Sequence, residues 1–238
     1  GVIRTRSAIL SGGAWASGFL RHHGVAFPQA SIRATSLRTE VAPAWLDAFY
    51  TPEIALTRRL DGSYTIAISG KGTLELTPQG IRYARQFMPM FVKRLKAVEF
   101  GIGSSFFNGP EALGGWSLDK KTPFERIRVL DPAPNRKAMA TLLERAHALV
   151  PGLRNVAVRE SWGAYIDSTP DAVPVISPTV GLKGLVLAAG LSGHGFGLGP
   201  GAGHLAADLA VGDAPIVDPR PFRHSRLLDG SQGEVGEF

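Results

Sequence analysis

The sequence predicts an α/β fold at the two ends of the chain and an α+β region between them. Three observations support this prediction. A strand, a glycine-rich turn and a helix follow one another near each end, in residues 7–24 and again in residues 185–211. The middle of the chain holds a hairpin signal and two amphipathic helices. We therefore expect two domains, with the chain leaving the first domain and returning to it.

The composition is typical of a globular protein. The 238 residues are 44% hydrophobic and 19% charged, which allows a substantial core in one or two domains. The 29 glycines and 17 prolines indicate many tight turns. The net charge is +6, but the lysines and arginines are scattered rather than grouped in a block or stripe. Nucleic acid is therefore not an expected partner.

Cysteine is absent, which excludes disulfides, thiolate catalysis and cysteinyl-linked cofactors. We predict no metal site. No transmembrane segment is expected, because even the most apolar stretch, residues 184–211, is interrupted by His194, His204 and Asp208. The first residues include neither Met nor a signal peptide and indicate a chain that begins inside a domain.

The first half of the chain carries clear local signals. The sequence of residues 7–24 predicts a short strand, a Gly-Gly turn and a helix. Residues 31–41 alternate as a strand does. Two further strands, residues 54–60 and 63–68, flank Asp61-Gly62, a strong hairpin signal.

Two helices are predicted next. Residues 78–98 have helical spacing, with Thr77 as the cap and Pro89 as a kink or division. Residues 135–150 form a second amphipathic helix, which Pro151 and Gly152 end. A short strand at residues 127–130 is predicted between them.

The last part returns to an α/β pattern. Strands are predicted at residues 156–166, 173–176 and 185–189. Pro200 suits the first turn of the helix that follows, where a missing N–H costs nothing. A polar tail ends the chain.

The glycine run of residues 190–203 is the most informative segment. Glycines let the backbone pass close to a ligand, and the open N–H groups at a helix start favour negative charge. An anionic or flat, electron-rich group is therefore expected here. A buried turn in which glycine serves close packing alone is the alternative, and the spacing leaves both open. The run contains neither G-x-G-x-x-G nor G-x-S-x-G, and the chain has no P-loop and no H-E-x-x-H.

Four segments, in this order, resemble the C-terminal part of the D-amino-acid oxidase family of flavoproteins, in the branch with glycine oxidase, sarcosine oxidase and D-amino-acid dehydrogenase. They are AILSGGAW at residues 8–15, ESWGAY at 160–165, TPDAVPVI at 169–176 and GLSGHGFG at 190–197. Together they span nearly the whole chain.

The resemblance implies an α/β plus α+β fold: the C-terminal part of a Rossmann-like FAD-binding domain with an inserted substrate domain built on a mixed or antiparallel sheet. The implied FAD-binding domain is residues 1–27 and 168–222, the substrate domain is 28–167, and residues 223–238 are a flexible tail. The FAD is expected to be non-covalent, because Ala164 stands about where sarcosine oxidases carry a flavin-linking cysteine.

The resemblance also implies the cofactor-binding residues, which fall into one group at the first turn and one at the glycine run. They are Gly12, Gly13, Ala14 and Trp15, and Gly190, Ser192, Gly193, His194, Gly195, Phe196, Gly197 and Gly199. His194 is a candidate for the flavin edge, in a structural or electrostatic role rather than in proton transfer.

The implied reaction is oxidation of the C–N bond of an amino acid or secondary amine by hydride transfer to flavin. The candidate substrate-binding residues are Tyr165, Ile166 and Arg38. Arg33, Arg38, Arg58 and Arg59 are candidate anchors for a carboxylate, since arginine is a bidentate donor, and most of them are expected to be solvated residues of the sheet. The implied partners are a small amine or amino acid and no nucleic acid. The implied location is the cytoplasm, with peripheral membrane association if the protein is a dehydrogenase.

Several positions depart from the family pattern. Relatives that oxidise small amino acids often carry arginines near Ile166 and Gly193, and sarcosine oxidases carry lysine at Gly197. The lysine that activates oxygen in some oxidases aligns with Glu75. The N-terminal G-x-G-x-x-G unit of the family is absent, so we expect a missing N-terminal half or a partner subunit. A non-catalytic subunit of a heteromeric dehydrogenase and a flavin-free binding module remain alternatives.

Overall fold

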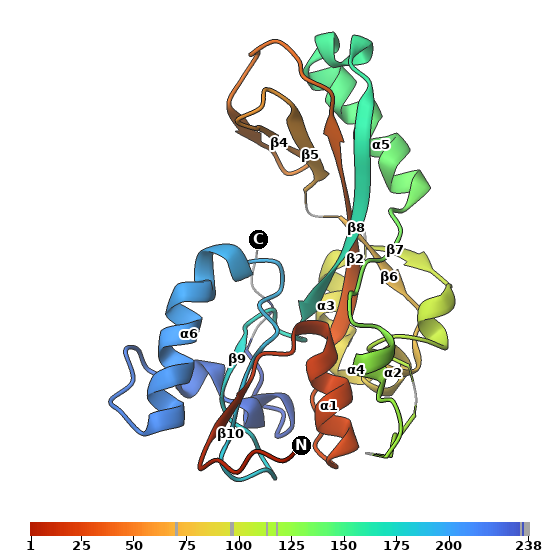
Figure 1. The fold of residues 1–238 in the computed structure, drawn as a ribbon. Coiled ribbons are helices and arrows are strands. Elements are labelled where there is room, and N and C mark those ends of the chain that lie inside the picture. The colour runs from red at the N-terminus through yellow and green to blue at the C-terminus, as the bar shows by residue number, and fades with distance from the viewer. Residues whose placement is uncertain (70, 96–97, 113, 118, 234, 236–238) are drawn as a thin grey trace.

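The computed structural model describes residues 1–69, 71–95, 98–112, 114–117, 119–233 and 235. It is a mixed α/β structure with two sheets, one of three strands and one of seven. Figure 1 shows the long β2–β8 pair as the spine of the larger sheet, with the smaller sheet beside its lower end. Among the described residues no helix is long and apolar enough to cross a membrane.

The three-stranded sheet is assembled from both ends of the chain. Its order is β1 (Ala8–Leu10), β10 (Leu185–Ala189) and β9 (Val175–Pro178), with β10 parallel to β1 and antiparallel to β9. The chain leaves after β1 and returns with β9, as the sequence predicts.

Helices cover both faces of this small sheet, since successive strand residues point to opposite faces. Leu187 packs with Leu20 of α1 (Ala16–His22) on one face. Val186 packs with Leu205 of α6 (Gly195–Val211) on the other. The alternating apolar residues of β10 therefore hold two helices against one strand.

The seven-stranded sheet fills the middle of the chain, in the order β3-β4-β5-β2-β6-β7 with β8 on β2. The strands are β2 (Ala30–Thr39), β3 (Ala48–Tyr50), β4 (Ile54–Arg58), β5 (Tyr64–Ile68), β6 (Gly72–Glu75), β7 (Val98–Gly101) and β8 (Val158–Ser168). All pairs are antiparallel except β6 with β7.

Four helices and several single turns accompany this sheet. The helices are α2 (Pro78–Arg82), α3 (Ala84–Arg94), α4 (Pro123–Arg126) and α5 (Arg136–Leu149). The 3-10 turns of the chain are η1 (Gly13–Trp15), η2 (Ser104–Phe106), η3 (Pro151–Asn155), η4 (Arg220–Phe222) and η5 (His224–Leu227). Leu142 and Ala146 of α5 pack on Leu56 and Ile66 of the sheet to form the largest core.

Several local predictions are confirmed. β4 and β5 form the expected hairpin, and Gly62 has a φ of +84°. Thr77 caps α2, since its hydroxyl accepts a hydrogen bond from the N–H of Gly80 at 3.0 Å. The second amphipathic helix is present as α5, and the structure adds that Asn135 caps it by accepting from the N–H groups of Lys137 and Ala138.

Other local predictions need correction. The predicted helix over 78–98 is two helices divided at Tyr83, and Pro89 lies inside the second one. α6 begins at Gly195, so Pro200 lies inside the helix rather than in its first turn. Residues 127–130 form no strand. Strands β3, β6 and β7 were missed because each has only three or four residues.

The predicted flexible tail is packed where it begins. His224, Arg226 and Leu227 of η5 are buried. The physical reason is the ion pair of Arg226 with Asp171, a contact that no local sequence pattern reveals.

Candidate functional site

The glycine loop, defined as residues 190–194, connects β10 to α6 with an unusual backbone. Gly190, Ser192 and Gly193 have φ values of +76°, +52° and +92°. Such values are easily adopted by glycine and cost energy for serine. The loop turns the chain sharply, so that α6 starts directly above the end of the strand.

Asp167, near the end of β8, holds this loop from the side. Its Oδ2 accepts a hydrogen bond from the N–H of Gly190 at 2.7 Å, and its carbonyl accepts from the N–H of Ser192 at 2.9 Å. Burial raises the pKa of the Asp167 carboxyl, and the Gly190 N–H opposes that rise. One residue therefore fixes two backbone amides of the loop.

Gln29 connects the loop to the first glycine turn. Its Nε2 donates to the carbonyl of Gly13 at 2.8 Å and to Asp167 Oδ2 at 3.3 Å. Its Oε1 accepts from the N–H of Ser17 at 3.0 Å. The fully buried Gln29 thus brings together η1, α1 and β8, and two glycine turns that lie far apart in sequence become neighbours.

The start of α6 suits an electron-rich ligand. The first N–H groups of a helix have no partner within the helix, and His194 at the N-cap places no side-chain oxygen or nitrogen on them. A Cβ on Gly197 or Gly199 would meet no atom within 4 Å. The structure thus offers free donors and open space, which fit the pyrimidine edge of a flavin.

The predicted cofactor residues divide between these two neighbouring turns. Gly12, Gly13, Ala14 and Trp15 belong to η1 and the residue before it. Gly190, Ser192, Gly193 and His194 form the loop, and Gly195, Phe196, Gly197 and Gly199 form the first turns of α6. Phe196 is fully exposed.

A polar face extends from Asp167 along the larger sheet. Tyr165 and Asp167 are two residues apart on β8, so their side chains share one face. Arg33 on β2 lies directly opposite Tyr165. Its Nη2 is 2.9 Å from Oε1 of Glu75, and the Tyr165 hydroxyl is 3.4 Å from Oε2 of Glu75.

The charges on this face are largely buried. The side chains of Arg33 and Glu75 are 19% and 9% exposed. The Nε of Arg33 is buried and finds no acceptor among the described residues. Burial, followed by the charge of Glu75, raises the pKa of Tyr165 to about 12, so its hydroxyl stays protonated at neutral pH.

Glu111 closes one end of this face. Its carboxylate accepts hydrogen bonds from the Ser31 N–H and from the Thr77 hydroxyl, the latter at 2.6 Å. Burial raises the pKa of Glu111. Between Glu111, Glu75 and Tyr165 lies a small polar cavity, into which Ser31 also opens.

Two predicted substrate residues have different surroundings. Ile166 lies against the glycine loop, because a Cβ on Gly193 would stand 3.6 Å from its Cγ2. Arg38 is paired with Glu160 at 2.9 Å and with Asp61. It stands five residues along β2 from Arg33, roughly 17 Å away by the rise of a strand. The guanidinium of Arg38 is thus occupied by two carboxylates, and a role for it in substrate binding stays a prediction.

A larger cavity of about 210 Å³ adjoins the polar one, since Asn108 and Pro110 line both. Its walls include Trp15, Trp116 and Phe124, with the guanidinium groups of Arg21 and Arg126. The Trp15 and Phe124 rings meet edge to face, with centroids 5.3 Å apart. Trp15 is therefore part of an aromatic wall.

Sequence reasoning missed Gln29, Asp167 and Glu111. Each is a single polar residue outside any motif, and only its burial reveals it. A weak signal existed for Asp167, which stands two residues before the TPD turn. No group of metal-ligating side chains occurs in the part of the chain that the structure describes.

A strand–glycine loop–helix unit beside a polar sheet face defines a nucleotide-cofactor-dependent enzyme of the α/β type. Residues 1–209 match the family model described as FAD dependent oxidoreductase. The chain belongs to this family, and the family's cofactor is FAD.

Individual proteins that are similar to this chain are consistent with this family. The chain is 34% identical to glycine oxidase from Pseudomonas putida over 92 residues, covering 39% of this chain and 25% of that protein. It is 30% identical to N-methyl-L-tryptophan oxidase from Salmonella heidelberg over 134 residues, 54% of this chain and 35% of that one. The L-amino acid deaminase structure from Proteus myxofaciens, in complex with anthranilate, superposes with a TM-score of 0.84 at 29% identity, covering 94% of this chain and 50% of that chain. The chain thus corresponds to half or less of each of these proteins.

Proposed function

We propose that this chain forms the substrate-side half of an oxidoreductase that oxidises the C–N bond of an amino acid or secondary amine. FAD, held non-covalently, would supply the acceptor for a hydride from the carbon beside the substrate nitrogen. The observation that carries the proposal is the Arg33–Glu75 pair beside Tyr165, on the same sheet face as the residue that holds the glycine loop.

These side chains suit a zwitterionic or aminated substrate. Arg33 keeps a buried Nε donor without an acceptor, which a carboxylate oxygen can fill. Glu75 carries the opposite charge 2.9 Å away and can hold a substrate ammonium group. Tyr165 lies opposite Arg33 and can position the substrate through its hydroxyl. In this arrangement the protein binds and orients, and His194 supports the flavin edge.

The test is a substrate screen on the full protein loaded with FAD, following flavin bleaching without oxygen. Arg33→Met should raise KM for the best amino acid by about 10- to 150-fold, the equivalent of one lost charge-assisted hydrogen bond. Arg145→Met on α5 is the matched control, because that side chain binds only the carbonyl of Glu53. Equal kinetics for the two variants would remove Arg33 from the site.

We infer further that a missing N-terminal half or partner subunit supplies the adenosine and pyrophosphate site. β1 is an edge strand of the small sheet, with Ile9 exposed, and such an edge is a place for further strands. Co-expression with the G-x-G-x-x-G unit should give yellow, soluble protein, whereas residues 1–238 alone should bind FAD weakly. Tight FAD binding by this chain alone would contradict this inference.

A non-catalytic partner subunit and a flavin-free binding module are the alternatives. A partner subunit would acquire flavin in the complex yet show no bleaching with any substrate. A flavin-free module would stay colourless when purified with excess FAD and its partner half. The substrate screen therefore separates all three functions.

We propose the cytoplasm as the location, with peripheral membrane contact if a quinone accepts the electrons. α2 and α3 carry exposed Ile81, Met88 and Val92 among several arginines and no acidic residue. A basic helix with an apolar face is suited to an anionic bilayer surface. Cell fractionation with and without a salt wash distinguishes the two locations.

A further inference from the structure

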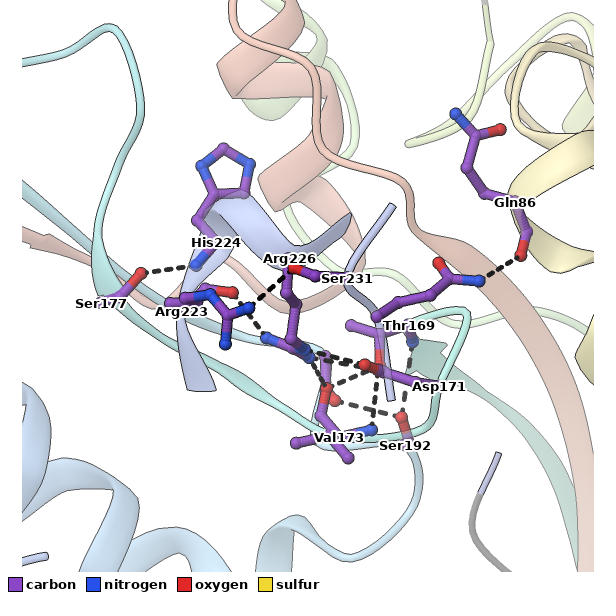
Figure 2. Close-up of polar contacts among 12 residues, drawn as sticks. Gln86, Thr169, Asp171, Val173, Ser177, Ser192, Arg223, His224, Arg226 and Ser231 are labelled. Atoms are coloured by element: carbon purple, nitrogen blue, oxygen red, sulfur yellow. Dashed lines mark hydrogen bonds and ion pairs between the residues drawn. The ribbon is translucent and has the colours of Figure 1, made fainter. Parts of the chain in front are cut away.

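The C-terminal segment beyond residue 209 lies outside the family match, yet it is built into the molecule. Its turn η5 buries three of its four residues, among them His224 and Arg226. His224 Nε2 lies 2.8 Å from the carbonyl of Ala26, and its own N–H donates to the Ser177 hydroxyl at 2.8 Å. Figure 2 shows this segment crossing the turn that contains Asp171.

Arg226 is the centre of these contacts. Its Nε donates to Asp171 Oδ2 at 2.7 Å, and its Nη2 donates to Asp171 Oδ1 at 3.1 Å and to the Val173 carbonyl at 2.6 Å. The two charged side chains are 3% and 1% exposed. A buried pair with this many hydrogen bonds holds one geometry, and loss of one partner leaves an uncompensated charge.

Asp171 transmits this geometry to Thr169. Its Oδ1 also accepts from the Thr169 hydroxyl at 3.2 Å and from the Val173 N–H at 3.1 Å. The single proton of that hydroxyl is shared with the Val173 carbonyl, which lies closer, at 2.7 Å from the hydroxyl oxygen. The backbone of the turn is itself strained, with Ala172 at a φ of +60°. The turn and the rotamer of Thr169 are thus both fixed by the carboxylate that Arg226 binds.

Thr169 in turn touches the glycine loop. Its Cγ2 fills the space beside Gly190 that a Cβ would need. Its N–H lies 3.5 Å from the Ser192 hydroxyl, which donates to the Gly190 carbonyl at 3.1 Å. Asp167 and Thr169 therefore both contact the loop, and the contact through Thr169 is linked to the C-terminal segment by Asp171 and Arg226.

We propose that Arg226 is a positioning residue for the glycine loop, acting through Asp171 and Thr169. It holds the left-handed backbone of Gly190 and Ser192 in the conformation that aims the start of α6 at the ligand. The effect on flavin rests on the proposed function; the effect on the loop does not. The turn η5, from His224 to Leu227, is, on this view, part of the cofactor-binding machinery.

The test compares Arg226→Met with Arg220→Met in the full protein. Arg220 lies in the same segment but forms an exposed pair with Asp218 at 2.8 Å, so it is the matched control. Hydrogen exchange is measured at the amides of Gly190 and Ser192, both of which bind Asp167. We expect exchange at these amides to become at least about tenfold faster in Arg226→Met, beyond any change in the hairpin of β4 and β5.

The second measurement is FAD binding and the flavin absorption spectrum, in the protein loaded with FAD. Arg226→Met should weaken FAD binding about tenfold and shift the flavin absorption spectrum, while Arg226→Lys, which keeps the charge, should recover part of both. Thr169→Ser removes only the methyl group and serves if Arg226→Met fails to fold; it should speed exchange in the loop more than exchange in the hairpin of β4 and β5.

Two outcomes of these experiments test the positioning role and the proposed function separately. Loop exchange that rises only as much as exchange in the β4–β5 hairpin would show that Arg226 stabilises the fold generally, and would overturn the positioning role. Faster loop exchange in a protein that binds no FAD would uphold the positioning role and reject the proposed function.

Discussion

The methyl group of Thr169 occupies the place where a side chain on Gly190 would begin. This contact gives the glycine a packing reason in addition to its φ of +76°. The sequence left two explanations for the glycine run open, ligand approach and close packing. The structure assigns close packing to Gly190, and it leaves open space beside Gly197, Gly199, Gly201 and Gly203 of α6, as the approach of a ligand requires.

The first prediction concerns that contact. Gly190→Ala should destabilise the fold, because the left-handed backbone alone costs alanine about 1–2 kcal/mol and the clash with Thr169 adds to it. Urea unfolding of the two proteins measures the difference. Gly203→Ala in α6 is the control, since its Cβ would meet nothing within 4 Å, and it should stabilise by about 0.5–1 kcal/mol. Equal stability of both variants would contradict the contact.

The second prediction concerns pH. Burial raises the pKa of Glu111 above its ordinary value of 4.5, so the folded protein holds this proton to a higher pH than the unfolded chain. The stability from this group is complete below pH 4.5 and is lost as the pH rises through the folded-state pKa. Glu111→Gln, which resembles the protonated acid, should remove this part of the pH dependence of unfolding.

The control for that experiment is Glu144→Gln, an exposed position on α5. Its profile should follow that of the unmodified protein. If Glu111→Gln and Glu144→Gln give the same profile, the pKa of Glu111 does not differ between the folded and unfolded chains, and the prediction is wrong.

The third prediction concerns attachment of the cofactor. The native assembly should release its FAD on acid or heat denaturation, because the chain has no cysteine and Ala164 stands at the expected linking position. The measurement is the flavin absorbance of the supernatant after precipitation of the protein. Flavin retained in the washed precipitate would show a covalent link through another residue.

The fourth prediction concerns the substrate. Glycine and sarcosine should bleach the flavin slowly, since neither Ile166 nor Gly193 supplies a guanidinium and such small substrates make few other contacts. Larger D-amino acids, secondary amines or opine-like compounds should react faster, because the cavity of about 210 Å³ beside the polar face accepts a large side chain. Fastest bleaching with glycine would mean that Arg33 suffices as the only anchor.

Local chemistry made much of this fold readable from the sequence. The hairpin around Gly62, the caps Thr77 and Asn135, and the strand before the glycine run depend on residues a few positions apart. Hydrophobic period and turn preference act over such distances, so they appear in the sequence itself. The resemblance to the D-amino-acid oxidase family, carried by four short segments, likewise depends on contiguous residues.

Only the tertiary structure decided how the site is held. Gln29 meets Asp167 across 138 residues of sequence, and Arg226 meets Asp171 across 55. Packing of the two sheets brings these polar groups together, and burial then requires each of them to find a partner. The same packing paired Arg38 with Asp61 and Glu160, and placed Arg33 opposite Tyr165 and against Glu75. Local sequence patterns indicate which kinds of residue a site needs. Long-range packing determines which individual residues of those kinds come together in it.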